Sequence, residues 1–399
     1  MKLASRTTRI VASPTLQMAA TVKAMKAQGV RVFDFAAGEP AQETPDYVRQ
    51  AAQAAIQAGF TKYTAVTGID ELKDAIIDSV QRTHQLHYEK PQILVSCGAK
   101  HVLYNFTQAF LDAGDEVIIP SPYWVSYPEQ ILLSDATPVF LKTEEASHYA
   151  INAASLESLI TPKTKAIILN SPCNPTGSLY DRATLEVVAE IALRHDLLIV
   201  SDEIYEHLVY DGHQHISIAS LGPEIAKRTL LVNGVSKSFS MTGWRIGYAA
   251  GPRELITAMG HIQSQSTSNP TSISQKAAVA ALQGGTAFIE DMVKDLDVQR
   301  TTMVKRLNAI PGITCPIPRG AFYAFPNVSA LFGRQHAKGT INSPSDLTQY
   351  LLTEGNIAGV AGEPFGSHEH IRLSYTPQIA TIEQGMERLA TAIQALHEH

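Results

Sequence analysis

Lys237 and Arg245 lie in one short stretch of the chain, between two apolar runs that are typical of β-strands. Small residues such as Ser236 surround the lysine, which suits a nucleophilic amine that must move between partners. An arginine close by can hold a phosphate through two parallel hydrogen bonds. Taken alone, such a pair is more commonly a solvated lysine beside a structural arginine. The interpretation therefore depends on what the rest of the chain supplies.

Other polar residues also follow strand-like runs. Gly98–Lys100 stands at the expected start of a helix, where free backbone N–H groups favour a phosphate. Asn174 lies in a turn made rigid by prolines, although turn chemistry alone would explain that segment. Asp202 directly follows an apolar run, with Tyr205 close behind, and an acid at such a position is often only a helix cap.

Together these residues supply an amine, a carboxylate, a phenol, an amide and a phosphate-binding turn. Pyridoxal 5′-phosphate is the cofactor that uses all of these groups, because its aldehyde reacts with a lysine and its ring nitrogen pairs with an acid. Its ring oxygen accepts hydrogen bonds from amide and hydroxyl groups. The chain contains neither GxxxxGK followed by Ser or Thr nor GxGxxG, so a P-loop and a dinucleotide fingerprint are not supported.

The composition limits the function classes. With 399 residues the chain is long enough for two domains, and 45% hydrophobic and 18% charged residues are ordinary for a globular protein. The net charge of −6 gives no electrostatic reason to expect nucleic acid or an anionic membrane as a partner. Three cysteines argue against a disulfide framework, and the fourteen histidines show no ligand spacing such as HExxH, so no metal is expected.

Residues 1–33 carry lysines and arginines but no acid, a composition similar to that of a transit peptide. The segment lacks the apolar core of a signal peptide, and the chain has no apolar run long enough to span a bilayer. We therefore expect residues 1–33 to begin a mature, cytoplasmic protein.

From residue 90 onward, short apolar runs alternate with helical patterns, which predicts a mostly parallel sheet covered by helices on both faces. Such sheets bind ligands at the carboxyl ends of their strands, where the polar residues above are found. The expected strands are 93–96, 116–119, 138–141, 166–169, 197–200, 230–232 and 247–250, with a turn at Asn233-Gly234 after the sixth.

Further elements surround this α/β unit. Strands are predicted at 30–36, 313–316, 321–325 and 371–374, and helices at 16–28, 45–58, 69–86, 253–309 with a break near 268–270, and 382–396. We expect two domains. The large one comprises residues 47–309, and the small α+β one combines residues 1–46 and 310–399.

Four segments together resemble the class I aminotransferases of fold-type I, and in particular the Ib subgroup of bacterial aspartate aminotransferases. They are SPYWVSYPE (121–129), NSPCNPTG (170–177), SDEIYEH (201–207) and GVSKSFSMTGWRIG (234–247). The likeness extends over essentially the whole chain. It implies the fold of the pyridoxal-phosphate-dependent transferases, with a mostly parallel seven-stranded sheet between helices and a smaller α+β domain. Tyr127 is a departure, because the other subgroup has histidine there, close to Asp202.

The resemblance gives the cofactor ring its partners. Lys237 forms the Schiff base and carries the proton between substrate and cofactor, and Asp202 keeps the pyridine nitrogen protonated. Asn174 and Tyr205 hold the ring oxygen. Trp124 stacks on the ring, although a core aromatic is the usual explanation for such a residue. Lys237, Asp202 and Tyr205 are thus the expected catalytic residues.

The cofactor phosphate is expected at a helix start. Arg245 lies beside it. Some relatives have a residue with a hydroxyl at the position of Gly234, which contacts the phosphate. Here that contact is either lost or made by Ser236. Tyr63 reaches the phosphate of the partner subunit, which implies a homodimer with shared active sites. The turn that carries the phosphate consists of Gly98, Ala99 and Lys100.

The resemblance also implies how a substrate binds. Arg372 resembles the arginine that binds the α-carboxylate with two hydrogen bonds, although alone it reads equally well as a structural arginine. Gly38 contacts the same carboxylate through its backbone. Lys100 and Thr15 occupy positions that bind the distal carboxylate, but Lys100 has a plain alternative as a phosphate neighbour. The expected substrate site is completed by Trp124 and Asn174.

The function implied is transfer of the amino group from L-aspartate to 2-oxoglutarate in a ping-pong reaction. Some relatives also accept prephenate, which the sequence leaves open. The alternatives are an aminotransferase for aromatic or other neutral amino acids and a β-lyase on the same scaffold. A non-catalytic ligand-sensing module of a transcription regulator is disfavoured, because no basic helix-turn-helix pattern precedes the scaffold and Lys237 is intact.

Overall fold

The computed structural model describes residues 3–397, so the outermost residues of the expected small domain, 1–2 and 398–399, lie outside the description. Within the described chain a seven-stranded sheet has the order β2-β8-β7-β6-β5-β3-β4. β8 runs antiparallel to both of its neighbours, and the other pairs are parallel. The predicted mostly parallel sheet is therefore confirmed. Its strands are β2 (Ile93–Ser96), β3 (Glu116–Ser121), β4 (Thr137–Lys142), β5 (Thr164–Asn170), β6 (Leu198–Asp202), β7 (Thr229–Gly234) and β8 (Gly247–Ala250).

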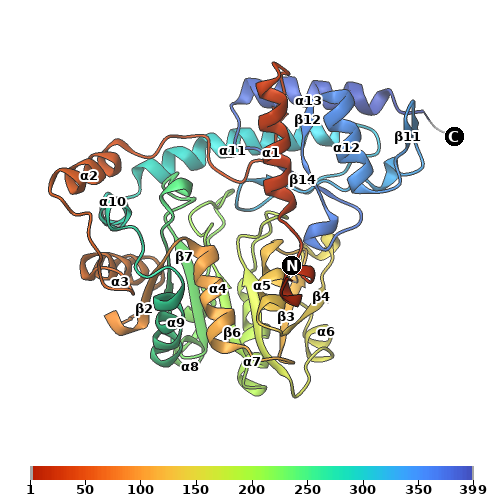
Figure 1. The fold of residues 1–399 in the computed structure, drawn as a ribbon. Coiled ribbons are helices and arrows are strands. Elements are labelled where there is room, and N and C mark those ends of the chain that lie inside the picture. The colour runs from red at the N-terminus through yellow and green to blue at the C-terminus, as the bar shows by residue number, and fades with distance from the viewer. Residues whose placement is uncertain (1–2, 398–399) are drawn as a thin grey trace.

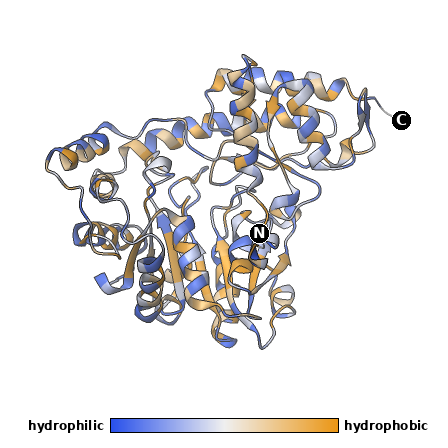
Figure 2. Cartoon of the chain, viewed as in Figure 1, coloured by the Kyte–Doolittle hydropathy of each residue, from blue (hydrophilic) through white to orange (hydrophobic). Residues whose placement is uncertain are grey.

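Helices cover both faces of this sheet, as the apolar central strands require (Figure 1). On one face, apolar side chains of β2, β3 and β5 to β8 pack against α4 (Ala99–Phe110), α5 (Ser126–Leu133) and α9 (Arg253–Ser266). The other face packs against α3 (Asp70–His84), α6 (Ala153–Glu157), α7 (Arg182–Arg194), α8 (Pro223–Ala226) and α10 (Ser272–Gln283). Figure 2 shows the strands as an apolar layer between these helices.

A second group of elements lies above the main sheet in Figure 1. An antiparallel three-stranded sheet has the order β13-β14-β9, and a parallel pair joins β1 near the N-terminus to β12. The strands are β1 (Phe33–Asp34), β9 (Tyr323–Ala324), β12 (Ile357–Ala358), β13 (Val360–Ala361) and β14 (Ile371–Ser374), and a hairpin of β10 (Gln335–His336) and β11 (Gly339–Thr340) lies apart. The helices here are α1 (Pro14–Ala27), α11 (Ala287–Asn308), α12 (Pro344–Gly355) and α13 (Ile379–Gln394), while α2 (Asp46–Gln57) extends to one side. The domain boundaries at 46/47 and 309/310 stay a prediction.

Several predicted elements differ from the structure. The expected strand 30–36 shrinks to β1, and residues 313–316 contribute only an isolated bridge between Thr314 and Asn327. Asn233-Gly234 forms no turn, because both residues pair with β8 inside β7. The helical region after residue 253 is broken twice rather than once. The second break follows α10, where Gly285 has φ 83°, a conformation that favours glycine.

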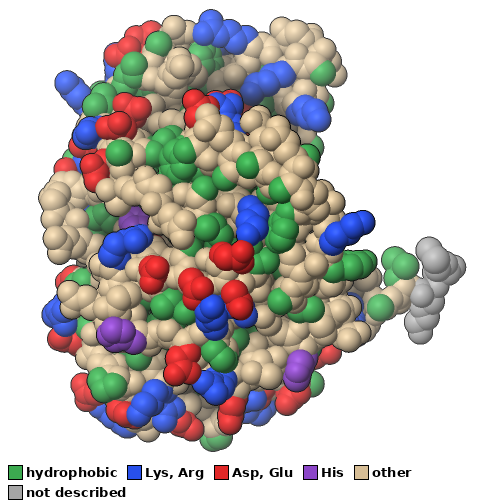
Figure 3. Space-filling model, turned by 90° about the vertical axis from the view of Figure 1, so that its left-hand side faces the viewer, with side chains coloured by type: hydrophobic (Ala, Val, Ile, Leu, Met, Phe, Trp, Pro, Cys, Tyr) green, Lys and Arg blue, Asp and Glu red, His purple; other side chains and the backbone are tan. Residues whose placement is uncertain are grey.

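Charged side chains are mixed on the surface. On the face drawn in Figure 3, Lys and Arg are interspersed with Asp and Glu rather than gathered into one basic surface. Among the described helices, none combines the length and the apolar character needed to cross a membrane.

Candidate active site

A cavity of about 480 Å³ lies at the carboxyl end of the central strands, and residues of α1, β1 and β14 also line it. Every expected site residue lines the cavity except Gly98 and Tyr63. Gly98 directly precedes α4 at the edge of the site, whereas Tyr63 is 91% exposed on the loop between α2 and α3. The structure therefore brings the expected site residues together within this chain, whereas Tyr63 lies outside the site.

Lys237 extends into the cavity from the turn between β7 and β8. Its Nζ donates a hydrogen bond to the carbonyl oxygen of Gly38 at 2.5 Å. Burial, together with the charges of Arg372 and Arg245 and against that of Glu39, lowers the pKa of Lys237 to about 8. Near neutral pH a useful fraction of this amine is therefore uncharged and nucleophilic.

Asp202 is the last residue of β6, and no helix begins there, so helix capping does not explain it. Its Oδ2 accepts a hydrogen bond of 2.7 Å from the hydroxyl of Tyr127, the residue that stands where the other subgroup has histidine. Burial raises the pKa of Asp202 to about 6, although the Tyr127 hydrogen bond opposes this. A buried, ionised carboxylate is therefore available to a cationic group in the cavity.

Two aromatic hydroxyls and an amide lie beside this carboxylate. The hydroxyls of Tyr205 and Tyr323 are 3.0 Å apart, and burial raises the pKa of Tyr205. The turn of Asn174 is held by a hydrogen bond from its backbone N–H to the side chain of Asn170, at 2.8 Å. Both Tyr205 and Asn174 thus reach the cavity as hydrogen-bonding groups that surrounding structure fixes in place.

The helix start at Gly98 is built for close approach. Gly98 has φ 86°, and a Cβ there would lie 2.4 Å from Nη2 of Arg245. A Cβ on Gly247 would lie 2.1 Å from the backbone nitrogen of Ala99, so β8 can meet the helix only through glycine. Arg245 donates to the carbonyl oxygens of Thr242 and Cys97, and pairs with no carboxylate of the described chain. An unpaired guanidinium beside a helix N-terminus fits an anion such as phosphate.

Arg372 is a second cation without an acidic partner. Its side chain is 2% exposed on β14 and lies over the rings of Tyr323 and Phe365, at 4.4 and 5.0 Å. Nη1 donates to Oδ1 of Asn174 and Nη2 to the carbonyl oxygen of Ala36, both at 2.9 Å, while Nε has no partner. Within residues 3–397 no carboxylate lies within ion-pair distance of this guanidinium. Because a buried unpaired charge is costly, the position suits a carboxylate ligand.

Lys100 of α4 and Thr15 of α1 both line the cavity. The Nζ of Lys100 lies 5.0 Å from the centre of the Trp124 ring, and burial with the charge of Arg245 lowers the pKa of Lys100. Thr15 is in the first turn of α1, where its hydroxyl lies 2.8 Å from that of Ser13. Ser236 completes the lining next to Lys237. The site thus contains separate cationic groups for more than one anionic group of a ligand.

Some lining residues were missed from the sequence. Tyr323 contacts both Tyr205 and Arg372, but it lies in a short strand whose pattern carries no sign of a site. Glu39 follows Gly38 and accepts a hydrogen bond of 2.7 Å from Thr242. Its position directly after Gly38, an expected substrate contact, is the signal in the sequence that points to Glu39.

The chemistry of the donor set fits pyridoxal phosphate. A buried amine, a buried carboxylate, ring-oxygen donors and an unpaired arginine at a helix start meet in one cavity, and Arg372 leaves a separate anion position.

Comparisons with known proteins agree with this geometry. The family model described as aminotransferase class I and II matches residues 30–389. The chain is 47% identical to an aspartate aminotransferase of Bacillus sp. strain YM-2, over 97% of this chain and 98% of the relative. A crystal structure of the aspartate aminotransferase from Rhizobium meliloti superimposes with a TM-score of 0.95 at 44% identity, covering 100% of both chains. The Thermus thermophilus aspartate aminotransferase solved with maleate has a TM-score of 0.92 at 37% identity, covering 98% of this chain and 100% of the other. The chain belongs to the class I and II aminotransferases.

Proposed function

We propose that this aminotransferase is a pyridoxal-phosphate-dependent aspartate aminotransferase, which moves the amino group of L-aspartate to 2-oxoglutarate and releases oxaloacetate and L-glutamate. The observation that carries the proposal is the buried guanidinium of Arg372, which has no carboxylate partner in the described chain, facing a cavity that Lys100 also lines. Two separated cations suit a substrate with two carboxylates. The names of the relatives and the maleate bound to the Thermus thermophilus enzyme support the same substrate class.

Pyridoxal phosphate, when bound, supplies an aldehyde that reacts with amines and a ring that accepts electrons. The N–H groups at the start of α4 and the guanidinium of Arg245 would hold its phosphate. Asp202 would pair with the ring nitrogen, and Asn174 and Tyr205 would donate hydrogen bonds to the ring oxygen. Trp124 would cover one face of the ring.

Lys237 performs the proton transfer. With its pKa lowered to about 8, the amine exists partly in the neutral form and can accept a proton from the substrate's Cα. The protonated Nζ would then pass that proton to the aldehyde-derived carbon of the cofactor. The half-buried amine lies beside Tyr205, Phe322 and Gly38, and a substrate that fills the cavity would exclude water from the proton while it moves.

Arg372 and Lys100 orient the substrate. The guanidinium would bind the α-carboxylate through two parallel hydrogen bonds, with the backbone of Gly38 beside it. Lys100 and Thr15 would bind the distal carboxylate. Aspartate and glutamate share both carboxylates and the amino group, so one site can process the two amino acids in turn, as a ping-pong reaction needs.

Two further features belong to the proposal. Tyr63 is almost fully exposed in the single chain, which supports a homodimer in which Tyr63 contacts the cofactor phosphate of the partner subunit. The cysteines of the described chain are free, which suits a reducing compartment, and the cytoplasm is the proposed location.

The absorption spectrum of the purified protein, before and after L-aspartate alone, tests the proposal. We expect a visible cofactor band that L-aspartate removes and 2-oxoglutarate restores. In Lys237→Ala the cofactor cannot attach covalently, so this band should be absent. A band that responds to phenylalanine or tyrosine but not to aspartate would keep the enzyme class and overturn the substrate. Absence of any band after pyridoxal phosphate is supplied would overturn the cofactor.

A further inference from the structure

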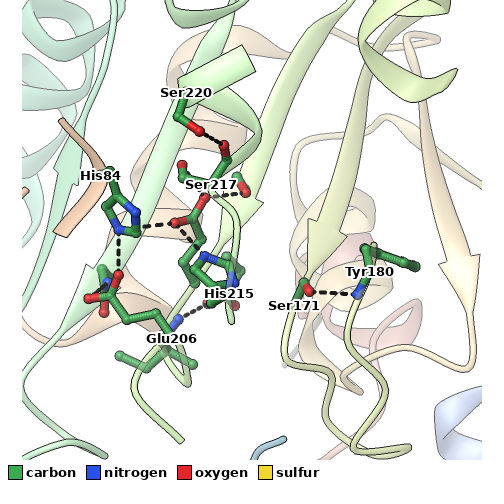
Figure 4. Close-up of polar contacts among 12 residues, drawn as sticks. His84, Ser171, Tyr180, Glu206, His215, Ser217 and Ser220 are labelled. Atoms are coloured by element: carbon green, nitrogen blue, oxygen red, sulfur yellow. Dashed lines mark hydrogen bonds and ion pairs between the residues drawn. The ribbon is translucent and has the colours of Figure 1, made fainter. Parts of the chain in front are cut away.

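Two histidines and two glutamates meet in a buried cluster outside the active-site cavity (Figure 4). His84 ends α3, Glu203 and Glu206 lie in the turn that follows β6, and His215 lies shortly before the 3-10 helix Ile218–Leu221. Their side chains are 4%, 0%, 6% and 5% exposed, respectively. None of the four lines the cavity, so the cluster is separate from the cofactor site.

One donor atom of each residue points to a common centre. Each residue offers one ligand atom, and the four atoms lie within 4.8 Å of one another. The contacts inside the cluster are made by Nε2 of both histidines and Oε2 of both glutamates. His84 Nε2 is 2.5 Å from Glu206 and 3.7 Å from Glu203, and His215 Nε2 is 2.9 Å from Glu203. Tetrahedral bonds of about 2.0 Å place ligand atoms about 3.3 Å apart, which falls within this spread.

The other carboxylate oxygens are already held by neighbours. Glu203 Oε1 accepts hydrogen bonds from the hydroxyls of Ser201 and Ser217, both at 2.7 Å. Glu206 Oε1 accepts one from the side-chain amide of Asn233 at 2.7 Å and also lies 3.3 Å from His207 Nε2. Each carboxylate is thus oriented by one oxygen and offers the other to the centre, as the outer partners of metal ligands do.

The charge of the cluster also favours a cation. Two carboxylates are buried beside two imidazoles, so their charge must be balanced either by protonated imidazoles or by a bound cation. The hydroxyl of Tyr88 is buried without a hydrogen-bond partner in the described chain, and burial together with the charge of Glu203 raises its pKa. A divalent cation bound by two neutral imidazoles would balance both carboxylates. The competing explanation is a metal-free network in which the histidines take up protons.

We propose that His84, Glu203, Glu206 and His215 bind one divalent transition-metal ion per chain, with Zn²⁺ the best match. Two nitrogen and two oxygen ligands suit Zn²⁺, whereas Mg²⁺ and Ca²⁺ prefer oxygen alone. Closed coordination by four side chains in a dry site is typical of a structural ion. The ion would tie α3 to the turn after β6, which directly follows Asp202 and carries Tyr205 into the cavity.

The test uses the full chain with its cofactor, without a histidine tag. The protein is saturated with Zn²⁺, passed through a desalting column in metal-free buffer, and analysed for metal by mass spectrometry. We expect about one Zn²⁺ per chain in the unmodified protein and in His87→Gln, and almost none in His84→Gln and His215→Gln. His87 is the matched control, because it lies close to His84 in sequence but is exposed. No retained Zn²⁺ in the unmodified protein would establish the metal-free network and overturn the proposal, as would equal retention in all variants.

A second measurement covers the case in which the histidine variants fail to fold. Co²⁺ replaces Zn²⁺ in the unmodified protein, and its visible absorption reports the coordination. Intense bands of four-coordinate Co²⁺, displaced by one equivalent of Zn²⁺, would support the site. Weak bands typical of six-coordinate Co²⁺ would overturn it. Neither readout depends on aminotransferase activity, so this proposal and the proposed function can fail separately.

Discussion

At the scale of single residues, the site is defined by charges whose partners the chain does not supply. Arg372 is buried with neutral hydrogen-bond partners, and Arg245 contacts carbonyl oxygens only. Lys237 is buried against a carbonyl oxygen and two aromatic rings. Of these cations Arg372 is the fully buried one, so its unpaired charge is costly, and an anionic group of a ligand would offset that cost.

The lowered pKa of Lys237 sets the pH at which cofactor attaches. Only the neutral amine reacts with an aldehyde. The rate at which pyridoxal phosphate attaches to the cofactor-free protein should therefore rise with pH, with the midpoint of the rise near pH 8. The rate is followed by stopped-flow absorbance after pyridoxal phosphate is added. Lys237→Ala serves as the blank. A midpoint near 10.5, the ordinary lysine value, would show that burial does not act on this amine.

Replacing Arg372 by lysine keeps the charge but removes the planar pair of donors. Loss of one hydrogen bond between charged groups is worth about 1.5–3 kcal/mol, so kcat/KM for L-aspartate should fall about 10- to 150-fold. Steady-state kinetics with 2-oxoglutarate as acceptor measure the change, and the cofactor absorption should stay as in the unmodified protein. An unchanged kcat/KM would mean that Arg372 is the structural arginine considered from the sequence.

At the scale of elements, the site depends on how α4 meets β8. The helix begins where the antiparallel strand β8 lies between β2 and β7, and Gly247 allows the two backbones to touch. Because the first N–H groups of α4 are also the expected phosphate ligands, packing and binding share the same atoms.

Gly247→Ala should therefore weaken both properties. The added Cβ would lie 2.1 Å from the Ala99 nitrogen, and such overpacking costs about 1–3 kcal/mol of unfolding free energy. Thermal unfolding and equilibrium titration with pyridoxal phosphate would register the two losses. Gly243→Ala is the matched control, because a Cβ there meets no atom within 4 Å. Equal behaviour of the two variants would contradict the close contact.

Much of the arrangement of helices and strands was predictable from the sequence. The apolar runs identified all seven strands of the main sheet, because strands of a sheet covered by helices on both faces have largely continuous apolar sequences. The polar residues after those strands, from Lys100 to Lys237, then fell into one cavity. Residues 313–316 were predicted wrongly, since a short apolar run does not reveal whether a partner strand is available.

The positions that sequence reasoning missed are brought in by distant segments. Tyr323 reaches the cavity from β9, and the link to Tyr205 exists only once the small antiparallel sheet forms. His84 and His215 show no ligand spacing along the chain, because their meeting depends on α3 packing near the turn after β6. Local patterns carry no information on such pairings.

At the scale of the whole molecule, the cavity joins parts of the chain that are far apart in sequence. Thr15, Lys237 and Arg372 line one space although they come from the beginning, the middle and the end of the chain. Tyr63 is the expected site residue that faces away, which leaves its role to a second copy.

A mixed dimer tests this role. In a dimer of one Lys237→Ala chain and one Tyr63→Phe chain, the single site with Lys237 would receive its Tyr63 from the partner. That site should bind pyridoxal phosphate as tightly as the unmodified protein, whereas the Tyr63→Phe homodimer should bind it about 10-fold more weakly. Differently tagged chains, separated after mixing, allow the titration. Weak binding in the mixed dimer would assign Tyr63 to its own chain's site, and a monomer in solution would remove the premise.

The end of β6 delivers neighbouring acids to opposite sides, Asp202 to the cavity and Glu203 to the histidine cluster. Side chains alternate along an extended chain, so a shift of one residue would remove the correct acid from both sites. A deletion just before Asp202 would bring Glu203 to the cavity and Ile204 to the histidines, whereas an insertion after Ser201 would bring Asp202 to the histidines and leave the cavity without its acid. The segment can vary by substitution, but its length is fixed by two sites at once.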